Sequence, residues 1–501
     1  MTGNAGRPNI IVIMTDQHDP AVSGCYGDHV VQTPNIDRLS REGITFDAAY
    51  TTSPLCVPAR LSFTSGQYIS RPRVSTWNNS CWLEDEQQPT IARILKKAGY
   101  DALLCGKMHY EYTRRYGFDD MLSIENGHVK TGVVTRRFVD DTSVNTKAWA
   151  ETQLDMHVGE TSNKIHRDTT KTAAATRFIK NRKASDKPFL LMVGYVCPHS
   201  PLIAPQSYLD QVKGKVPMPE LPDGLLENLP TNYKHNRMGF GYVEQDPGMV
   251  KKGRELYWAL VGWVDNEIGK VLKALDESEI LDNTIVIYTC DHGENKGDHG
   301  MWWKNNMYEH AARIPLIVRW PRKWEGNQRR SGACSTVDLV RTIAEIAGAD
   351  VPNYWDGDSL FPYLDDPGYD WKDFALSEYY SHNIVSGFTM VRKGKWKYVY
   401  HAKAPGNDPE TELYNLEEDP KEFNNLASSP EHAELVNELH ASIVDELGEQ
   451  PDDIEHRCVA TVPYYKRPGF WTKERLVKKA RAKKKIKAAE QQWKKFKEMR
   501  L

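Results

Sequence analysis

The segment from Ser53 to Gly66 combines a cysteine, a proline and an arginine at a spacing that could support nucleophilic chemistry. Cys56 stands two residues before Pro58 and four before Arg60. Proline suits the first turn of a helix, so this spacing predicts a helix that begins near Val57, with the cysteine at its positive end. A helix start, a cation and small residues together favour an anion site.

Two interpretations of Cys56 follow from the residues alone. Free cysteine is among the most buried residue types, so composition favours a structural thiol in the core. The alternative is a thiolate nucleophile that the helix and Arg60 activate. The choice between them depends on which other groups the fold brings to the same place.

Two pairs of polar residues follow apolar runs of the chain and suit a metal site. Asp16 and Gln17 come after one run, and Asp291 and His292 come after another. Four oxygen or nitrogen donors from the ends of neighbouring strands suit a hard or borderline divalent cation. An aspartate at a strand end can also be a capping residue. The second pair favours the metal site.

Four further side chains could contribute positive charge or move protons. Lys107 and His109 are two residues apart after an apolar run, so on an extended segment both could face one pocket. His199 follows another apolar run, and Lys304 stands next to aromatic residues. Each has an ordinary alternative when taken singly: a solvated lysine, a histidine packed in a loop, or a lysine whose stem lies along apolar surface.

Apolar runs that alternate with helical patterns must position these residues. The runs at 8–14, 100–106, 189–196 and 284–289 predict buried strands, and helical patterns lie at 34–43, 90–99 and 256–275. This alternation predicts an α/β fold with a large, mainly parallel but mixed sheet sandwiched by helices. Open sheets of this kind bind ligands at the carboxyl ends of their strands. Residues 202–250, rich in Pro and Gly, are expected to form a long loop region near the site.

The pattern changes near residue 370. Residues 388–400 alternate around an Arg-Lys-Gly-Lys turn as a hairpin does, 412–416 suggest a third strand, and 430–447 have a helical period. We therefore expect a smaller C-terminal antiparallel α+β subdomain. The predicted division is a catalytic α/β domain at 1–369, the antiparallel subdomain at 370–465 and a basic helical tail at 466–501.

Charge and composition limit the partners and the compartment. The 501 residues carry a net charge of −3, yet 473–501 hold 13 Lys and Arg against three Glu. This tail could bind a polyanion or a neighbouring subunit in a homo-oligomer, or it could be a solvated terminus. No apolar run has membrane length, and no nucleic-acid partner is expected. The eight cysteines are too sparse for a disulfide scaffold, and no signal-peptide pattern is present, so we expect a cytoplasmic protein, or a periplasmic or secreted one if a leader was removed.

Taken together, these motifs resemble the type I sulfatases of the alkaline phosphatase superfamily over roughly residues 8 to 450. The resemblance rests on Cys-x-Pro-x-Arg at 56–60, Gly-Lys-Met-His at 106–109, Pro-His-Ser-Pro at 198–201 and Asp-His-Gly-Glu at 291–294, followed by Lys304. It implies hydrolysis of a sulfate monoester of a sugar or small organic molecule. It also implies that a formylglycine-generating enzyme oxidises Cys56 to formylglycine.

The same resemblance implies a role for each candidate residue. The formylglycine hydrate at position 56 would be the nucleophile and would touch one divalent metal. The metal ligands would be Asp16, Gln17, Asp291, His292 and the modified Cys56. Arg60 and Lys107 would hold the hydrate, and His109 would take a proton from it. His199 and Lys304 would bind the sulfuryl oxygens, with His199 or a neighbour protonating the leaving oxygen.

Several departures from the common pattern narrow the resemblance. The pairs Asp16-Gln17 and Asp291-His292 are similar to the choline-sulfatase and phosphonate-monoester-hydrolase branch. Calcium is the expected metal. Manganese is the alternative, because an imidazole ligand favours the softer of the two ions. The signature ends in Gly66-Gln67, where the family commonly has Gly-Arg. This departure concerns the oxidation of Cys56 by the formylglycine-generating enzyme.

Substrate recognition and the alternatives to a sulfatase remain open at this point. Asn78 is a candidate substrate-binding residue against an ordinary turn asparagine. Trp77, Trp82, Trp302 and Trp303 flank the motifs and could stack on a sugar or surround a quaternary ammonium group, but core packing is the default interpretation for each. One alternative function is a phosphonate monoester or phosphodiester hydrolase on the same scaffold. The other is a non-catalytic scaffold whose basic tail binds a polyanion.

Overall fold

The computed structural model describes residues 6–79, 81–111, 113–122, 156–240, 242–243, 245–404 and 406–461, and the backbone of two short strands at 136–137 and 464–465. The basic tail at 466–501 lies outside the described residues, so its roles stay predictions.

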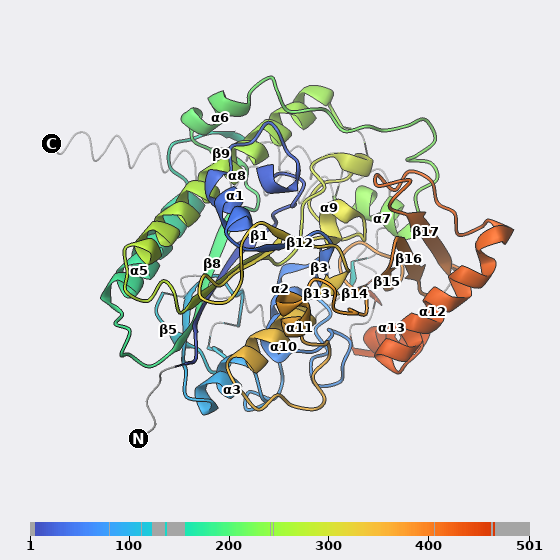
Figure 1. Cartoon of the computed structure of the whole chain (residues 1–501). Coiled ribbons are helices and arrows are strands. Elements are labelled where there is room, and N and C mark those ends of the chain that lie inside the picture. The colour runs from blue at the N-terminus through green and yellow to red at the C-terminus, as the bar shows by residue number, and fades with distance from the viewer. Residues whose placement is uncertain are drawn as a thin grey trace.

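An eight-stranded mixed sheet lies at the centre of the molecule (Figure 1), in the order β12-β2-β11-β10-β1-β8-β4-β5. Its strands are β12 (Gln328–Arg330), β2 (Ile44–Phe46), β11 (Leu316–Arg319), β10 (Thr284–Cys290), β1 (Asn9–Asp16), β8 (Phe189–Pro198), β4 (Asp101–Gly106) and β5 (Asp119–Asp120). β1 is parallel to both β10 and β8, and β4 is parallel to β8, whereas β11 runs antiparallel to β10. The expected large, mainly parallel sheet is confirmed.

The sheet is buried on both faces because successive side chains of its central strands point to opposite sides. Ile11 and Ile13 join a core with one group of helices, and Ile10 and Val12 join a second core with another group. The first group is α1 (Pro34–Arg41), α5 (Asn163–Asn181), α6 (Gln206–Val212) and α8 (Pro247–Asp276). The second group is α2 (Cys56–Ser65), α3 (Ile91–Lys97), α10 (Thr336–Ile346) and α11 (Phe361–Asp365). Continuous apolar runs predict such two-sided burial.

The prediction of one long loop over residues 202–250 is wrong in part. The segment contains α6, α7 (Thr231–Phe240) and the first turn of α8. Leu209 and Val212 of α6 are buried in the same core as α8, and Tyr233 of α7 is fully buried. Tertiary burial therefore stabilises short helices between the prolines and glycines that suggested a loop.

A separate four-stranded antiparallel sheet follows near the C-terminus. It consists of β14 (Phe374–Tyr379), β15 (Phe388–Lys393), β16 (Trp396–His401) and β17 (Glu410–Asn415), with α12 (Ala433–Leu447) and α13 (Pro451–Thr461) after it. Lys393 pairs with Trp396, which leaves a two-residue turn with Gly394 at φ 56°. The expected hairpin is confirmed, and β14 is a strand that the sequence did not predict.

The remaining elements are short. They are β3 (Ala49–Tyr50), β6 (Arg136–Arg137), β7 (His157–Val158), β9 (Ile203–Ala204), β13 (Cys334–Ser335), β18 (Tyr464–Tyr465), α9 (Glu309–Ala312) and 3-10 turns at Gly24–Tyr26, Asp298–Gly300 and Pro430–His432. All eight cysteines lie in the described ranges, and none of them forms a disulfide. Within the described ranges, no helix is long and apolar enough to cross a bilayer.

A buried ion triad connects the antiparallel sheet to the segment that precedes the central strand β11. Lys397 of β16 is completely buried, and its Nζ lies 3.0 Å from Glu309 Oε1 and 2.7 Å from Glu422 Oε1. Glu309 begins α9, and its backbone N–H donates to Glu422 Oε2 at 2.7 Å. This triad is thus one of the contacts that hold the second sheet against the rest of the molecule.

His299 is a buried histidine that makes stability depend on pH. It is 3% exposed and stacks on Tyr308 with ring centroids 3.7 Å apart. Burial and the neighbouring His310 lower the pKa of His299 from 6.5 to about 4. The unfolded chain therefore takes up a proton below pH 6.5 that the folded chain takes up only near pH 4, so folding loses free energy as the pH falls through this window.

We expect the unfolding free energy to fall by about 2 kcal/mol between pH 7 and pH 5 through this histidine alone. Urea titrations of the wild type and of His299→Phe at both pH values measure the contribution as the difference between their pH slopes. Strain from the φ of 52° at this position affects both pH values equally and cancels. Equal slopes in the two proteins would contradict the assignment.

Candidate active site

The carboxyl ends of four adjacent strands meet at one edge of the central sheet. Asp16 ends β1, Lys107 follows β4, His199 follows β8 and Asp291 follows β10. The strand order β10-β1-β8-β4 makes these ends neighbours. Parallel strands therefore bring together residues that are up to 275 positions apart in the chain.

Cys56 is the first residue of α2 and points into this group of strand ends. Its Sγ lies 3.1 Å from His292 Nε2 and 3.9 Å from Asp16 Oδ1. The backbone N–H of Val57 donates to Asn79 Oδ1 at 3.1 Å, which satisfies a free donor of the helix start. All ten residues of α2 are buried. The helix begins one residue before the predicted start.

The surroundings of Cys56 favour negative charge. Burial alone would raise the pKa of the thiol, but Lys304, His292 and Lys107 outweigh it, so that the pKa lies well below its usual value. His109 and His199 also make hydrogen-bonding contacts with the sulfur. A group that becomes anionic at this position is thus stabilised by several positive partners, as an activated nucleophile requires.

Arg60 fixes the two aspartates of the site. It is completely buried, with Nε 2.8 Å from Asp291 Oδ2 and Nη2 3.3 Å from Asp16 Oδ2. Its Nη1 donates to the Lys107 carbonyl oxygen at 2.6 Å, and the Lys107 ammonium forms an ion pair with Asp16. One guanidinium therefore bridges the ends of β1, β4 and β10.

A possible metal-binding group lies directly beside Cys56. Ligand atoms of Asp16, Cys56, Asp291 and His292 all lie within 4.8 Å of one another, and all four residues are buried. His292 Nδ1 donates to the Gly293 carbonyl oxygen at 3.1 Å, which orients the ring so that Nε2 faces the group. Two carboxylates and one imidazole with a fixed orientation fit a divalent cation.

Gln17 borders this group and connects it to Lys304. Its Oε1 accepts a hydrogen bond from Lys304 Nζ at 2.6 Å, and its side-chain nitrogen donates to Glu294. Its backbone N–H donates to Asp291 Oδ1 at 3.1 Å. The predicted ligand therefore lies at the site, with its oxygen on a lysine in this structure.

Lys304 and His199 form a second group beside Cys56. Lys304 Nζ lies 3.2 Å from His199 Nε2, and Lys164 Nζ lies 3.2 Å from His199 Nδ1. Burial, Lys304 and Lys164 lower the pKa of His199 to about 3, so its imidazole is neutral near pH 7. Two lysines and a neutral imidazole make a site for oxyanion oxygens.

His109 reaches the site by a local turn. We expected an extended segment to aim Lys107 and His109 the same way, but no strand continues past Gly106, and His109 has a φ of 57°. This left-handed conformation turns the imidazole toward Cys56. Within the described part of the chain, the Nδ1 of His109 is buried and has no hydrogen-bond partner.

Comparisons with known proteins agree with this geometry. The sulfatase family model matches residues 8–349. The chain belongs to the sulfatase family. A second model, described as N-sulphoglucosamine sulphohydrolase, C-terminal, matches residues 297–449 of this sulfatase. The family resemblance seen in the motifs is confirmed, and with it the activity of a sulfuric ester hydrolase.

Individual relatives cover nearly the whole sulfatase. A choline-sulfatase from Rhizobium meliloti is 30% identical over 85% of this chain and 83% of the relative. A solved structure in complex with its substrate, D-glucosamine-2-N,6-O-disulfate, is 26% identical, covers 89% of this chain and 99% of that one, and has a TM-score of 0.71. A phosphonate monoester hydrolase of Agrobacterium radiobacter is 20% identical, covers 88% and 96%, and has a TM-score of 0.70. At that identity the last match shows the fold alone.

Two residues of the sulfatase site were not singled out by sequence reasoning. Glu294 is 2% exposed and accepts hydrogen bonds from the Gln17 side chain and from the backbone N–H groups of Lys296 and Trp303. It belongs to the Asp-His-Gly-Glu motif, which was its only signal. Lys164 lies on α5, in a polar stretch whose pattern gave no reason to connect it with His199.

The asparagine and tryptophan candidates have different surroundings. Asn78 is 4% exposed and lies 3.7 Å from the Cys81 sulfur, whereas its neighbour Asn79 contacts the start of α2. Trp77 is 3% exposed and packs edge-on against Tyr380 in a core cluster. Trp303 is half-buried and donates to Ser200 Oγ at 3.2 Å, beside His199. Trp303 therefore contacts the residue that follows His199.

Proposed function

We propose that this sulfatase hydrolyses the sulfate monoester of a sugar or small organic molecule with formylglycine, made from Cys56, as its nucleophile. The observation that carries the proposal is the position of Cys56 beside two groups. Carboxylates and an imidazole suited to a cation adjoin it, and so do Lys304 and His199. Negative charge that develops on sulfuryl oxygens is stabilised by such an arrangement.

The role proposed for each side chain follows from its contacts. Lys304 and His199 adjoin each other and bind the sulfuryl oxygens, with one of them protonating the leaving oxygen. Lys107 and Arg60 hold Asp16 and stabilise negative charge at position 56. His109, which contacts the Cys56 sulfur, takes a proton from the nucleophile. When present, the divalent metal adds positive charge at the nucleophile and the formylglycine supplies a hydrated aldehyde.

We further propose that the metal is calcium, held by Asp16, Gln17, Asp291 and His292 beside position 56, with manganese as the alternative. Oxygen donors favour calcium, and His292 favours the softer ion. We expect protein stripped with EDTA to recover both melting temperature and activity on adding the preferred ion. Asp16→Asn, which removes charge at one ligand, should reduce the metal-dependent rise in melting temperature. A rise that is unchanged in Asp16→Asn would contradict this ligand set.

The proposed maturation requires a formylglycine-generating enzyme that recognises the segment around Cys56. The signature Cys-Val-Pro-Ala-Arg supports this partner, and Gln67 at its end is a departure from the family's common pattern. Coexpression with such an enzyme should raise the fraction of chains in which Cys56 has lost its sulfur, measured by peptide mass analysis.

The substrate class is tested by ranking matched esters. A relative named choline-sulfatase and one solved with a disulfated glucosamine support small and sugar sulfates. We expect kcat/KM for an aryl or sugar sulfate to exceed that for the matching phosphate diester or phosphonate monoester. A large preference for the phosphorus esters would overturn the sulfate assignment in favour of the phosphonate alternative. No turnover of any ester by fully modified, metal-loaded protein would favour the non-catalytic scaffold.

A further inference from the structure

A buried lysine joins the two loops at the group of possible metal ligands. The first loop consists of residues 17–19 after β1, and the second consists of residues 291–297 after β10. Lys296 of the second loop forms an ion pair with Asp19 of the first. The two residues are 1% and 0% exposed. Arg60 connects the aspartates at the strand ends, and this ion pair connects the loops further along the chain.

The side chain of Lys296 also contacts its own loop. Its Nζ donates to the Glu294 carbonyl oxygen at 2.8 Å and lies 3.3 Å from Asp298 Oδ2. The backbone N–H of Lys296 donates to Glu294 Oε1 at 3.0 Å, and Glu294 also accepts from the Gln17 side chain. Through Asp19 and Glu294, Lys296 is therefore connected to both loops.

The backbone at Lys296 lies in the left-handed region, with a φ of 55°. Residues that carry a Cβ rarely adopt this conformation, and they keep it where the surrounding structure holds them. Backbone strain of this kind is concentrated at functional sites. The contacts of the Lys296 ammonium thus fix a locally unfavourable conformation beside the possible metal ligands.

Helix α8 supports both loops. Arg254 Nη1 donates to the Lys296 carbonyl oxygen at 3.0 Å. Tyr257 Oη donates to the Gln17 carbonyl oxygen at 2.7 Å and accepts from the Asp19 backbone N–H at 3.0 Å. Arg254 and Tyr257 are three residues apart and share one face of the helix. The loops that Lys296 joins are therefore also held against one long helix.

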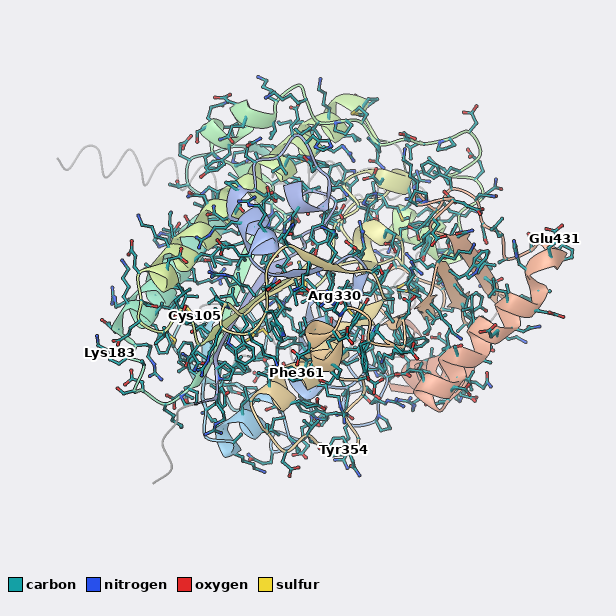
Figure 2. All side chains as sticks on the ribbon, in the orientation of Figure 1. Cys105, Lys183, Arg330, Tyr354, Phe361 and Glu431 are labelled. Atoms are coloured by element: carbon teal, nitrogen blue, oxygen red, sulfur yellow. The ribbon has the colours of Figure 1, made fainter. Side chains whose placement is uncertain are left out.

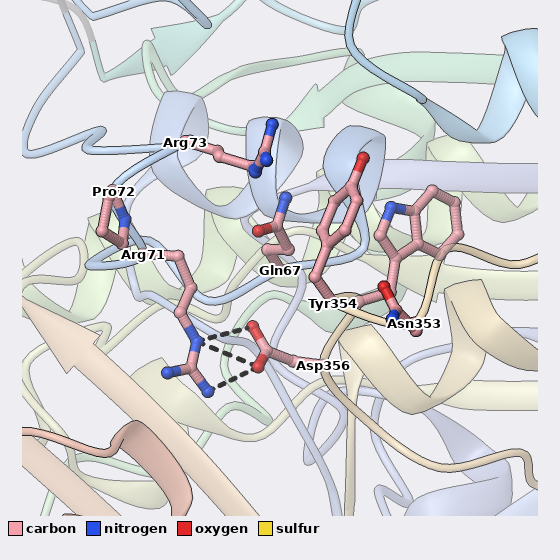
Figure 3. Close-up of a pocket in the computed structure, with 8 residues that line it drawn as sticks. Gln67, Arg71, Pro72, Arg73, Asn353, Tyr354 and Asp356 are labelled. Carbon is pink, nitrogen blue, oxygen red and sulfur yellow. Dashed lines mark hydrogen bonds and ion pairs between the residues drawn. The ribbon is translucent and has the colours of Figure 1, made fainter.

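This ion pair differs from the partly exposed pairs of the molecule. Figure 3 shows Arg71 paired with Asp356 at 2.6 Å, beside a pocket of about 440 Å³, and the Arg71 side chain is 25% exposed. Water can solvate one partner of such a pair when the other is removed. Lys296 and Asp19 are buried, so removal of either charge leaves the other without its partner inside the protein.

We propose that Lys296 is a positioning residue for the metal site and that its ion pair with Asp19 sets the spacing of the two loops. The inference rests on the metal ligands proposed above and does not depend on the proposed reaction. Residues that orient metal ligands typically change metal affinity by about 10–100-fold when they are replaced. Lys296 acts in this way through Asp19 and Glu294.

The sign of the effect distinguishes positioning from charge. Lys296 is a cation close to a cation site, so its charge alone opposes a bound metal. If Lys296 acted only through its charge, Lys296→Met would tighten metal binding. If Lys296 positions the loops, the same substitution weakens metal binding.

Calorimetric titration of EDTA-stripped protein with calcium, and separately with manganese, measures the affinity. Peptide mass analysis matches the preparations for the fraction of modified Cys56. We expect Lys296→Met to weaken binding of the preferred ion by at least about tenfold. The matched control is Lys183→Met, because the Lys183 side chain is 66% exposed, pairs with Glu279 and lies at the edge of the molecule in Figure 2. It should leave the affinity unchanged.

A double variant serves where Lys296→Met fails to fold. Lys296→Met combined with Asp19→Asn removes both charges of the pair and keeps the net charge of the wild type. The asparagine retains an oxygen for His310, whose Nδ1 lies 2.7 Å from Asp19 Oδ2. Charge alone predicts wild-type metal affinity for this protein. Loss of the connection between the loops predicts an affinity at least about tenfold weaker.

The outcomes separate this inference from the proposed function. Metal binding as tight as in the wild type, or tighter, in a variant that near-UV circular dichroism shows to be folded would overturn the positioning role. A wild type that binds neither ion would overturn the proposed ligand set together with it. A wild type that binds metal and hydrolyses no ester would count against the proposed reaction alone.

Discussion

Cys56→Ala is expected to lower kcat/KM for a sulfate ester by at least about 10⁴-fold, because it removes the precursor of the proposed nucleophile. The neighbouring groups cannot substitute for it. Lys107, Lys304 and His292 surround position 56 with positive charge, but each is placed to stabilise a nucleophile and none to replace it. The measurement is the initial rate of metal-loaded protein on an aryl sulfate. Mass analysis of the wild-type peptide that contains Cys56 shows what fraction of it is modified.

The matched control is Cys458→Ala, which removes another buried cysteine, in α13 and away from the site. It should retain wild-type kcat/KM, although it loses packing volume. Two results would refute the nucleophile assignment: a Cys56→Ala protein that keeps its activity, or an active wild type whose thiol is intact in every chain. Circular dichroism melts of both variants separate loss of chemistry from loss of fold.

The second large effect is on stability, for Lys397→Met. This change leaves Glu309 and Glu422 buried without their shared cation, which should lower the free energy of unfolding by about 3–5 kcal/mol. Burial raises the pKa of Glu422, and removing the lysine raises it further. Protonated carboxyl groups are easier to bury, so the loss should be larger at pH 8 than at pH 6. Urea titrations at both pH values measure it.

Lys393→Met provides the matched control from the adjacent strand. Lys393 lies 2.9 Å from Glu438, and both side chains are largely exposed. A surface ion pair of this kind contributes about 0–1 kcal/mol, and its loss should depend little on pH. Equal destabilisation by the two substitutions would show that the buried triad has no special role in joining the sheets.

The central sheet could be predicted because its strands are buried on both faces. Continuous apolar runs at β1, β4, β8 and β10 mark such strands, and polar residues directly after them mark their carboxyl ends. Local sequence could not show that Cys56 lies 3.1 Å from His292, since that distance depends on how α2 packs on the sheet. The joint occurrence of the motifs, through the family resemblance, predicted that these two residues share one site.

Other features depend on contacts that no local pattern reveals. Lys164 reaches His199 because α5 packs beside β8, and a polar helix face gives no sign of such a contact. The conformation of His109 arises from a single left-handed residue. The helices α6 and α7 are stabilised by burial against α8 and the antiparallel sheet, which propensity alone does not predict.

The complete burial of α2 has a consequence for how the enzyme is made. No residue from Cys56 to Ser65 is accessible in the folded chain, so an oxidising enzyme cannot engage this segment once the sheet has closed around it. Any enzymatic modification of Cys56 must then occur before the chain folds. Under the proposed maturation, a chain that folds first is left with a thiol, so the fraction of active molecules in a preparation should reflect the ratio of the rate of modification to the rate of folding.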